Sequence, residues 1–167
     1  EQGKPAFFGH RQGMENTKRI VTYAQKLGVK FITLWGFSTE NWSRPEKEVN
    51  FLMKLFEKMI DSHLDYYHKQ GVKFNHIGSL KELPLSLQNK IRKAIELTKN
   101  NKGSVANFAL NYGGRDELKR AIQKIIKSGA NAEEVTLDLI KENLDTVGLA
   151  EPDFIIRTSG EQRTSGF

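Results

Sequence analysis

Four short runs of mostly apolar residues, rich in β-branched and aromatic side chains, are separated by longer stretches with helical periodicity. The runs cover residues 29–35, 72–78, 105–111 and 153–158, and each predicts a β-strand. Strands that alternate with helices are typical of an α/β fold. The pattern therefore predicts one α/β domain over residues 1–167, with a mainly parallel central sheet ringed by helices.

Five stretches carry apolar residues that mostly recur three to four positions apart, which is the spacing of one helix face. Each stretch therefore predicts an amphipathic helix. In chain order, the positions are Ile20, Ala24 and Leu27; Leu52, Leu55, Phe56, Met59, Ile60 and His63; Ile91, Ile95 and Leu97; Leu118, Ala121, Ile122 and Ile125; and Leu137, Ile140 and Leu144.

The second predicted helix has a distinct start and a wide apolar arc. Ser43 and Glu46 have the spacing of a capping box, and Pro45 suits the first helical turn. Phe51 and Met53 extend the apolar surface beyond one stripe, so the helix needs more than one partner surface. It is either a central helix in a thick core, or it packs on the sheet and lines an apolar groove on its other side.

Composition narrows the class of protein. Charged residues make up 28% and hydrophobic residues 38% of the 167 positions, which is ordinary for a globular domain. The absence of cysteine excludes disulfides and thiolate catalysis. No apolar run reaches membrane-spanning length and no signal sequence is evident, so we expect a cytoplasmic protein. The net charge of +6 favours anionic partners, although a solvated lysine surface accounts for most of it.

Polar clusters follow three of the predicted strands. They are "GFSTENWSR" (36–44), "NYGGR" (111–115) and "RTSGEQRTSGF" (157–167). In a parallel α/β sheet the carboxyl ends of the strands share one edge, where ligands bind. We therefore expect the three clusters to converge.

The clusters are rich in arginine, whose planar guanidinium matches phosphate oxygens in pairs. The arginines are Arg44, Arg115, Arg157 and Arg163, and the last cluster adds Ser159, Gly160, Thr164 and Ser165. In "FFGHRQGM", residues 9–13 precede the predicted first helix, and a helix N-terminus attracts anions. These features predict a phosphate or diphosphate ligand. A nucleoside triphosphate or dinucleotide is not indicated, because the chain has no Walker loop and no GxGxxG motif.

Several of these residues also have a purely structural interpretation. His10 is either a structural hydrogen-bonding residue or part of the anion site, and Trp42 either fills the edge of the core or contacts substrate. Arg115 is interpreted as a surface residue, and residues 111–114 as a turn. Arg157 ends an apolar strand, where an unpaired charge is costly, which favours a role in ligand binding.

Four segments in order, "FGH", "FSTENWSRP", "NFALNYGGR" and "RTSGEQR", closely resemble the cis-prenyltransferases, the family of undecaprenyl diphosphate synthase. The resemblance covers essentially all of the chain. It implies a parallel sheet ringed by helices with an apolar tunnel for the growing product, and condensation of farnesyl diphosphate with isopentenyl diphosphate to form Z double bonds. It also implies Mg²⁺ as cofactor, a homodimer, membrane contact through the lipid product, and a role in cell-wall glycan synthesis.

The resemblance also implies roles for individual residues. Arg157, Arg163 and Ser165 match the residues that bind isopentenyl diphosphate. His10 and Arg44 match positions near the allylic diphosphate, and Ser38 and Asn41 match the polar pair at the reacting centre. Trp42 and Glu48 match residues that place the allylic substrate.

The chain departs from the family pattern in two respects. The family's N-terminal strand with its Asp-Gly-Asn-Gly-Arg-Trp motif and the C-terminal part with a metal-binding glutamate are absent, so we expect no metal ligand in this chain. Ala6 stands where the family commonly has an arginine that contacts diphosphate. We expect Ala6→Arg to lower the KM for farnesyl diphosphate.

Two other functions are compatible with parts of the pattern. Non-catalytic subunits of heteromeric cis-prenyltransferases also lack the aspartate motif, but they have little need of "FSTENW". A nucleic-acid-binding domain would carry a basic stripe with exposed aromatic residues. Here the lysines are scattered over helices, so we expect no nucleic acid partner.

Overall fold

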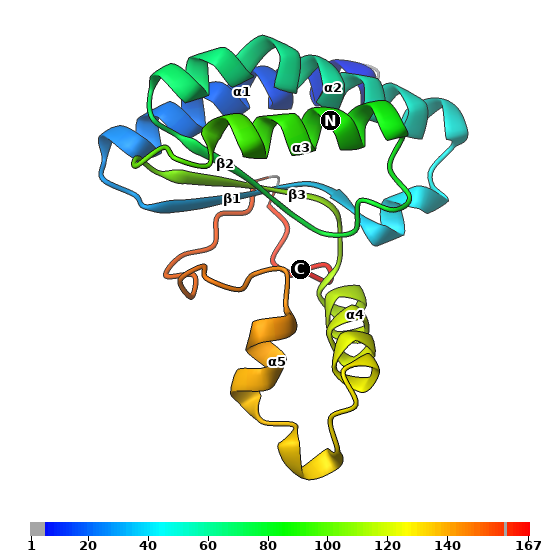
Figure 1. The fold of residues 1–167 in the computed structure, drawn as a ribbon. Helices are drawn as coiled ribbons and strands as arrows, with labels where there is room; N and C mark the ends of the chain where they lie inside the picture. The colour runs from blue at the N-terminus through cyan, green and yellow to red at the C-terminus, as the bar shows by residue number, and fades with distance from the viewer. Residues whose placement is uncertain (1–5, 159) are drawn as a thin grey trace. The chain divides into compact units, whose positions relative to one another are not determined.

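The computed structural model describes residues 6–158 and 160–167, without the side chains of residues 6 and 7. Its three strands form one sheet (Figure 1). The strand order is β1-β3-β2. β2 and β3 pair in parallel, from Lys73 opposite Val105 to Ile77 opposite Ala109. The strands are β1 (Phe31–Ser38), β2 (Lys73–Ile77) and β3 (Val105–Tyr112). The first three predicted strands and the α/β class are confirmed.

The chain divides into two compact units, Glu1–Asn111 and Tyr112–Phe167. In the first unit, three helices cover one face of the sheet (Figure 1). They are α1 (Ala6–Lys26), α2 (Glu46–Lys69) and α3 (Leu85–Thr98). The core lies between these helices and the sheet, where Phe74 stacks on Phe108 with ring centroids 4.5 Å apart.

The wide apolar arc of α2 is buried. Its 24 residues contact α1, α3 and β2, which explains why apolar side chains occupy more than one stripe. The buried positions are Val49, Leu52, Met53, Phe56, Met59, Ile60, Leu64 and Tyr67. The interpretation as a central core helix accounts for these contacts, and the apolar tunnel stays a prediction.

Two details of the predicted helices are wrong. α2 begins at Glu46 with Pro45 as its N-cap and no side-chain cap, so Ser43 and Glu46 form no capping box. The Ser43 hydroxyl instead donates to the Glu40 carbonyl, at 2.8 Å, within the preceding turn. On α1 the fully buried side chain is Val21, whereas the Ile20 side chain is 44% exposed.

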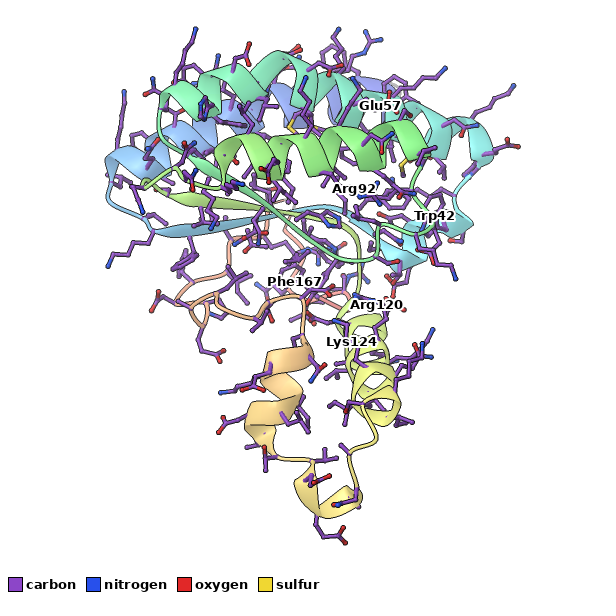
Figure 2. All side chains as sticks on the ribbon, in the orientation of Figure 1. Trp42, Glu57, Arg92, Arg120, Lys124 and Phe167 are labelled. Carbon is purple, nitrogen blue, oxygen red and sulfur yellow. The ribbon has the colours of Figure 1, made fainter. Side chains whose placement is uncertain are left out.

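The second unit contains α4 (Gly114–Lys127), a short 3₁₀-helix η2 (Ala132–Glu134) and α5 (Leu137–Asn143), and α4 contacts α5. Arg120, labelled on α4 in Figure 2, donates to both carboxylate oxygens of Asp145, at 2.8 and 2.6 Å. The hydrogen bonds to Asp145 raise the pKa of Arg120 above its ordinary value. The last two predicted helices are therefore confirmed, and the ion pair of Arg120 with Asp145 connects α4 to the segment that follows α5.

The fourth predicted strand is wrong. Residues 153–158 have no regular secondary structure, and the Phe154, Ile155 and Ile156 side chains are 80%, 67% and 79% exposed. A strand needs a neighbour to complete its hydrogen bonds, and within the described residues of this unit the segment has no partner strand. Among the described helices, none is long and apolar enough to cross a membrane.

Candidate functional site

The first candidate region is the β1 turn, residues 36–48, which leads from β1 into α2. Phe37 is 1% exposed and packs edge-on against Phe56, with ring centroids 6.4 Å apart. A Cβ atom at Gly36 would lie 2.9 Å from Leu110 Cδ2, closer than real Cβ contacts allow. Glycine at this position leaves room for the side chains of Leu110 and Phe56, which would have to shift to admit a Cβ atom. The end of β1 is therefore firmly seated in the core.

Ser38 and Asn41 lie in the same turn. The Ser38 backbone N–H donates to Asn41 Oδ1 at 3.0 Å. This contact bridges the entry to the 3₁₀-helix η1 (Thr39–Ser43). Ser38 is 8% exposed, so the turn that carries the two residues predicted at the reacting centre lies beside the core.

Trp42 follows on the same 3₁₀-helix and is labelled in Figure 2. Its ring packs edge-on against Phe37, with centroids 5.1 Å apart, and it is partly buried against the core. The indole Nε1–H donates to Asn111 Oδ1 at 2.8 Å. The structural interpretation of Trp42, as a residue that fills the core edge, thus has direct support, and the ring is also held by a polar contact.

Glu48 joins two cationic side chains. Its Oε1 accepts from Arg44 Nη1 at 2.8 Å and lies 3.3 Å from His10 Nε2. All three side chains are partly exposed, at 36%, 28% and 22% for Arg44, His10 and Glu48. Arg44 keeps further N–H groups that can bind an anion. The structure thus brings together three of the predicted residues: one from α1, one from the turn before α2 and one from the first turn of α2.

The predicted anion site at the start of the first helix is wrong. α1 begins at Ala6, so Gly9, His10 and Arg11 lie within the helix rather than before it. Their backbone N–H groups are therefore not the unpaired donors of a helix start. Among the described residues, nothing lies within 4 Å of a Cβ built at Gly9 or Gly13, so no close approach there calls for glycine. His10 faces Glu48 through its side chain alone.

The second candidate region is the arginine arm, residues 153–167, in the second unit. Arg157 Nη1 donates to the Arg163 carbonyl at 2.6 Å and to Ser165 Oγ at 2.8 Å. Arg163 Nε lies 3.0 Å from Glu161 Oε2. The three residues predicted to bind isopentenyl diphosphate are close to one another and exposed. The predictions for Ser159 and the Ala6 side chain lie outside the described residues.

Two of the three strand-end clusters meet within the first unit. The contact between Trp42 and Asn111 joins the cluster after β1 to the end of β3. Arg115 is exposed on α4, as its surface interpretation predicted. Asn111 is a residue whose role sequence reasoning missed, because its pattern indicated only a turn. The signal that was present is an asparagine two residues before a pair of glycines, since asparagine tolerates positive φ.

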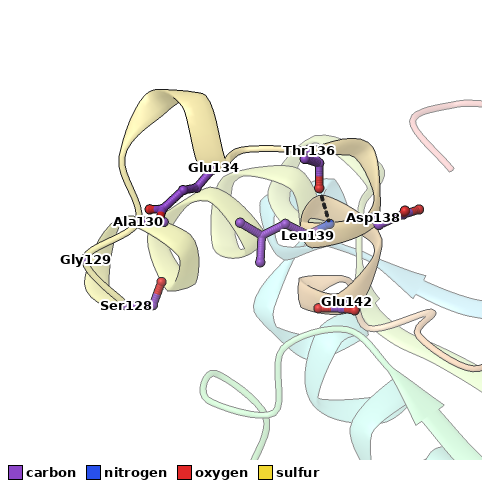
Figure 3. Close-up of a pocket in the computed structure, with 8 residues that line it drawn as sticks. All are labelled: Ser128, Gly129, Ala130, Glu134, Thr136, Asp138, Leu139 and Glu142. Carbon is purple, nitrogen blue, oxygen red and sulfur yellow. Dashed lines mark hydrogen bonds between the residues drawn. The ribbon is translucent and has the colours of Figure 1, made fainter.

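A surface pocket in the second unit contains none of the predicted site residues (Figure 3). Three of its side chains are carboxylates, from Glu134, Asp138 and Glu142. A site with this charge repels diphosphate. Thr136, also at the pocket, accepts from the Leu139 backbone N–H at 3.2 Å as the cap of α5. The pocket is formed by the end of α4, the turn that follows it and α5.

Comparison with known proteins gives a consistent result. The family model described as undecaprenyl diphosphate synthase matches residues 1–167. The isoprenyl transferase of Clostridium perfringens is 46% identical over 171 residues, covering 100% of this chain and 68% of the relative. That of Bacillus cereus is 43% identical, covering 98% and 65%. The chain therefore spans about two thirds of the length of these curated relatives.

Solved structures share the fold. The crystal structure of lavandulyl diphosphate synthase from Lavandula x intermedia, in complex with dimethylallyl diphosphate, matches with a TM-score of 0.93 and 32% identity, over 99% of this chain and 74% of that chain. A probable undecaprenyl diphosphate synthase from Campylobacter jejuni matches with a TM-score of 0.83 and 29% identity, over 93% and 73%.

Proposed function

Because the chain belongs to the undecaprenyl diphosphate synthase family, a family of transferases, we propose that it catalyses cis-prenyl chain elongation. The reaction condenses isopentenyl diphosphate with an allylic diphosphate, farnesyl diphosphate, and gives a Z-polyprenyl diphosphate such as undecaprenyl diphosphate. The product would serve as the precursor of a lipid carrier for cell-wall glycan synthesis. The match of the family over residues 1–167 is the observation that carries this proposal.

In this proposal the β1 turn binds the allylic diphosphate. Arg44 and His10 supply the donors, and the carboxylate of Glu48 holds both side chains in place. When the allylic carbon–oxygen bond breaks, its electron pair leaves with the diphosphate. Donors already aimed at that group stabilise the growing negative charge. Trp42, held against Phe37, would direct the allylic chain.

The arginine arm would bind isopentenyl diphosphate. Arg157 and Arg163 match diphosphate in charge and in hydrogen-bonding pattern, and the Ser165 hydroxyl already accepts from Arg157. Binding of both substrates in register supplies an entropic advantage to the carbon–carbon bond formation. A proton then leaves the isopentenyl unit, and Ser38 with Asn41 would receive it or position the unit for its loss.

The family also implies Mg²⁺, which would assist departure of the diphosphate. Among the described residues, no group of three or more His, Cys, Asp or Glu side chains is arranged to hold a metal ion. The donor set of these residues therefore does not fit the ion, and no step above passes through it. Titration of activity with EDTA and then with MgCl₂ tests the requirement in the intact protein.

We further propose a homodimer located in the cytoplasm, with membrane contact through the lipid product. The net charge of +6 favours approach to an anionic surface. Sedimentation of the intact protein, with and without vesicles that contain anionic lipid, tests both the oligomeric state and the membrane contact.

A second candidate is transfer with a shorter prenyl substrate. It is favoured by the TM-score of 0.93 to lavandulyl diphosphate synthase, a structure determined with dimethylallyl diphosphate. The non-catalytic subunit and the nucleic-acid-binding domain are less well supported, because the residues of "FSTENW" are present and two of them, Asn41 and Trp42, are held by hydrogen bonds.

The experiment that tests the proposal is product analysis. The intact protein is incubated with labelled isopentenyl diphosphate, Mg²⁺, and either farnesyl or dimethylallyl diphosphate as primer. Long Z-polyprenyl products from farnesyl diphosphate support the proposal, and short products from dimethylallyl diphosphate alone support the second candidate. The absence of any product from either primer would contradict both.

A further inference from the structure

Asn111 combines three features that are individually unusual. It is a polar residue that is only 2% exposed, it lies near the end of β3, and its backbone φ is 52°. Positive φ is disfavoured for residues other than glycine, although asparagine tolerates it better than most. A buried polar side chain is costly unless it is hydrogen-bonded. The position therefore calls for an explanation in terms of what the amide contacts.

The amide of Asn111 is fully committed to three partners. Its Oδ1 accepts from Trp42 Nε1 at 2.8 Å, and its Nδ2 donates to the Ser79 carbonyl at 3.0 Å and to Glu82 Oε2 at 2.7 Å. The indole N–H can only donate, whereas a carbonyl and an ionised carboxylate can only accept. The amide thus has one satisfied orientation, and a flipped amide would lose all three contacts.

The Glu82 side of this chain of contacts is also fixed. Ser79 Oγ donates to Glu82 Oε2 at 2.8 Å, and the hydrogen bonds from Ser79 and Asn111 lower the pKa of Glu82, which keeps the carboxylate ionised. Gly78 has a φ of 115°, and a Cβ there would lie 2.3 Å from the Leu110 carbonyl oxygen. Only glycine lets the turn after β2 approach the end of β3 this closely.

These contacts link the carboxyl ends of all three strands. Ser79 and Glu82 follow β2, Asn111 is the residue before the last one of β3, and Trp42 follows β1. We propose that Asn111 is a positioning residue, whose amide transmits the fixed position of Glu82 to the Trp42 indole and so holds that ring in one orientation toward the allylic substrate. This inference rests on the proposed function for its effect on catalysis, but the link between the two side chains can be measured without any activity.

The first measurement is NMR of the intact protein with ¹⁵N-labelled tryptophan. The chain has two tryptophans, and Trp42→Phe identifies the indole resonance of Trp42. Asn111→Gly removes the amide and allows positive φ without strain. We expect this variant to shift the Trp42 indole N–H resonance and to speed its hydrogen exchange about tenfold or more, while the Trp35 resonance stays in place. An unchanged Trp42 resonance would overturn the inference, whatever the enzyme does.

The second measurement is steady-state kinetics with farnesyl and isopentenyl diphosphates. Of the three hydrogen bonds that Asn111→Gly removes, the neutral one to Trp42 is the one that bears on the allylic substrate. Its loss predicts a rise of about 3- to 10-fold in the KM for that substrate, with little change for isopentenyl diphosphate. Trp42→Phe keeps a ring but lacks the donor, so the double variant is expected to match the more affected single variant. Additive effects, or equal increases in both KM values, would show a general structural role and would contradict positioning.

A compensating pair of substitutions distinguishes loss of the proposed link from misfolding. Asn111→Asp keeps an acceptor for Trp42 but places a second carboxylate against Glu82, so it is expected to impair allylic binding. Glu82→Gln restores a donor opposite that carboxylate, whereas the Ser79 carbonyl still faces an acceptor, so the double variant is expected to recover part of the lost affinity and to shift the NMR resonance back toward its wild-type position. No recovery would contradict the proposed link. An inactive wild-type protein with an intact NMR response would instead count against the proposed function alone.

Discussion

The β1 turn and the arginine arm carry similar side chains after similar apolar runs, yet they are held very differently. In the β1 turn, Phe37 is 1% exposed and Trp42 is held by Asn111. In the arginine arm, Phe154 is 80% exposed, and Arg157 contacts a carbonyl and the Ser165 hydroxyl. In these two regions, polar residues that follow an apolar run are held against the core only where the run itself is buried. This difference predicts that substitutions in the β1 turn change stability and binding together, whereas those in the arm change binding alone.

The largest expected effect concerns the two apolar anchors. Phe37→Ala removes a buried ring, so it is expected to lower the free energy of unfolding by about 3–5 kcal/mol. Phe154→Ala removes an exposed ring and is expected to change it by less than about 0.5 kcal/mol. Urea unfolding of the intact protein, followed by circular dichroism, measures both. Equal losses would show that the arm is as well packed as the turn.

The next largest effect concerns Arg157. Loss of charge-assisted hydrogen bonds to a diphosphate costs about 1.5–3 kcal/mol, which corresponds to a rise of about 10- to 150-fold in the KM for isopentenyl diphosphate in Arg157→Ala. The unfolding midpoint is expected to stay within error, because the side chain is exposed. Arg92→Ala, at an exposed arginine on α3, is the matched control. A similar rise in the control would mean that only net charge matters.

A smaller effect is expected at Glu48. Glu48→Gln weakens the contacts with Arg44 and His10, and partly exposed ion pairs contribute about 0.2–1 kcal/mol. We expect the KM for farnesyl diphosphate to change about 2- to 5-fold, with kcat less affected. Glu46→Gln, two residues earlier in the same helix turn, provides the control. Loss of all activity in Glu48→Gln would show that this carboxylate takes part in the chemistry rather than in placement.

The smallest expected effect is a pH dependence of the stability of the first unit, which arises from His63. Burial, and secondarily the charge of Lys18, lowers the pKa of His63, and among the described residues its buried Nδ1 has no hydrogen-bond partner. The unfolded chain therefore binds this proton more readily. Stability is complete above the ordinary His pKa of about 6.5, and it falls as the pH drops from there toward the lowered pKa. Urea midpoints across this range are expected to depend less on pH in His63→Gln than in the exposed control His68→Gln.

The same contrast explains what the sequence could and could not predict. The runs that became β1, β2 and β3 and the five helices followed from periodicity, because burial imposes a regular pattern on both. Residues 153–158 show an equally apolar run, but pairing depends on a neighbouring strand that local composition does not reveal. The extra turns at the start of α1 were also missed, which misplaced Gly9 and His10 relative to the helix start.

For a related reason, some contacts of the candidate site could be predicted from the sequence and others could not. The contact between Arg44 and Glu48 is local, because the two residues lie four positions apart where the chain enters α2, so it was within reach of the sequence. The contact between Trp42 and Asn111 joins residues 69 positions apart, and no local pattern encodes it. Strand-end geometry correctly predicted that the clusters after β1 and β3 meet, but not which atoms bond.

We propose that the two regions bind different substrates: the β1 turn binds the allylic diphosphate, and the arginine arm binds isopentenyl diphosphate. The most direct test is to measure both KM values in Arg44→Ala and in Arg157→Ala. We expect a crossed result: Arg44→Ala raises the KM for farnesyl diphosphate, and Arg157→Ala raises that for isopentenyl diphosphate. Equal increases in both constants in both variants would show that the two regions do not bind separate substrates.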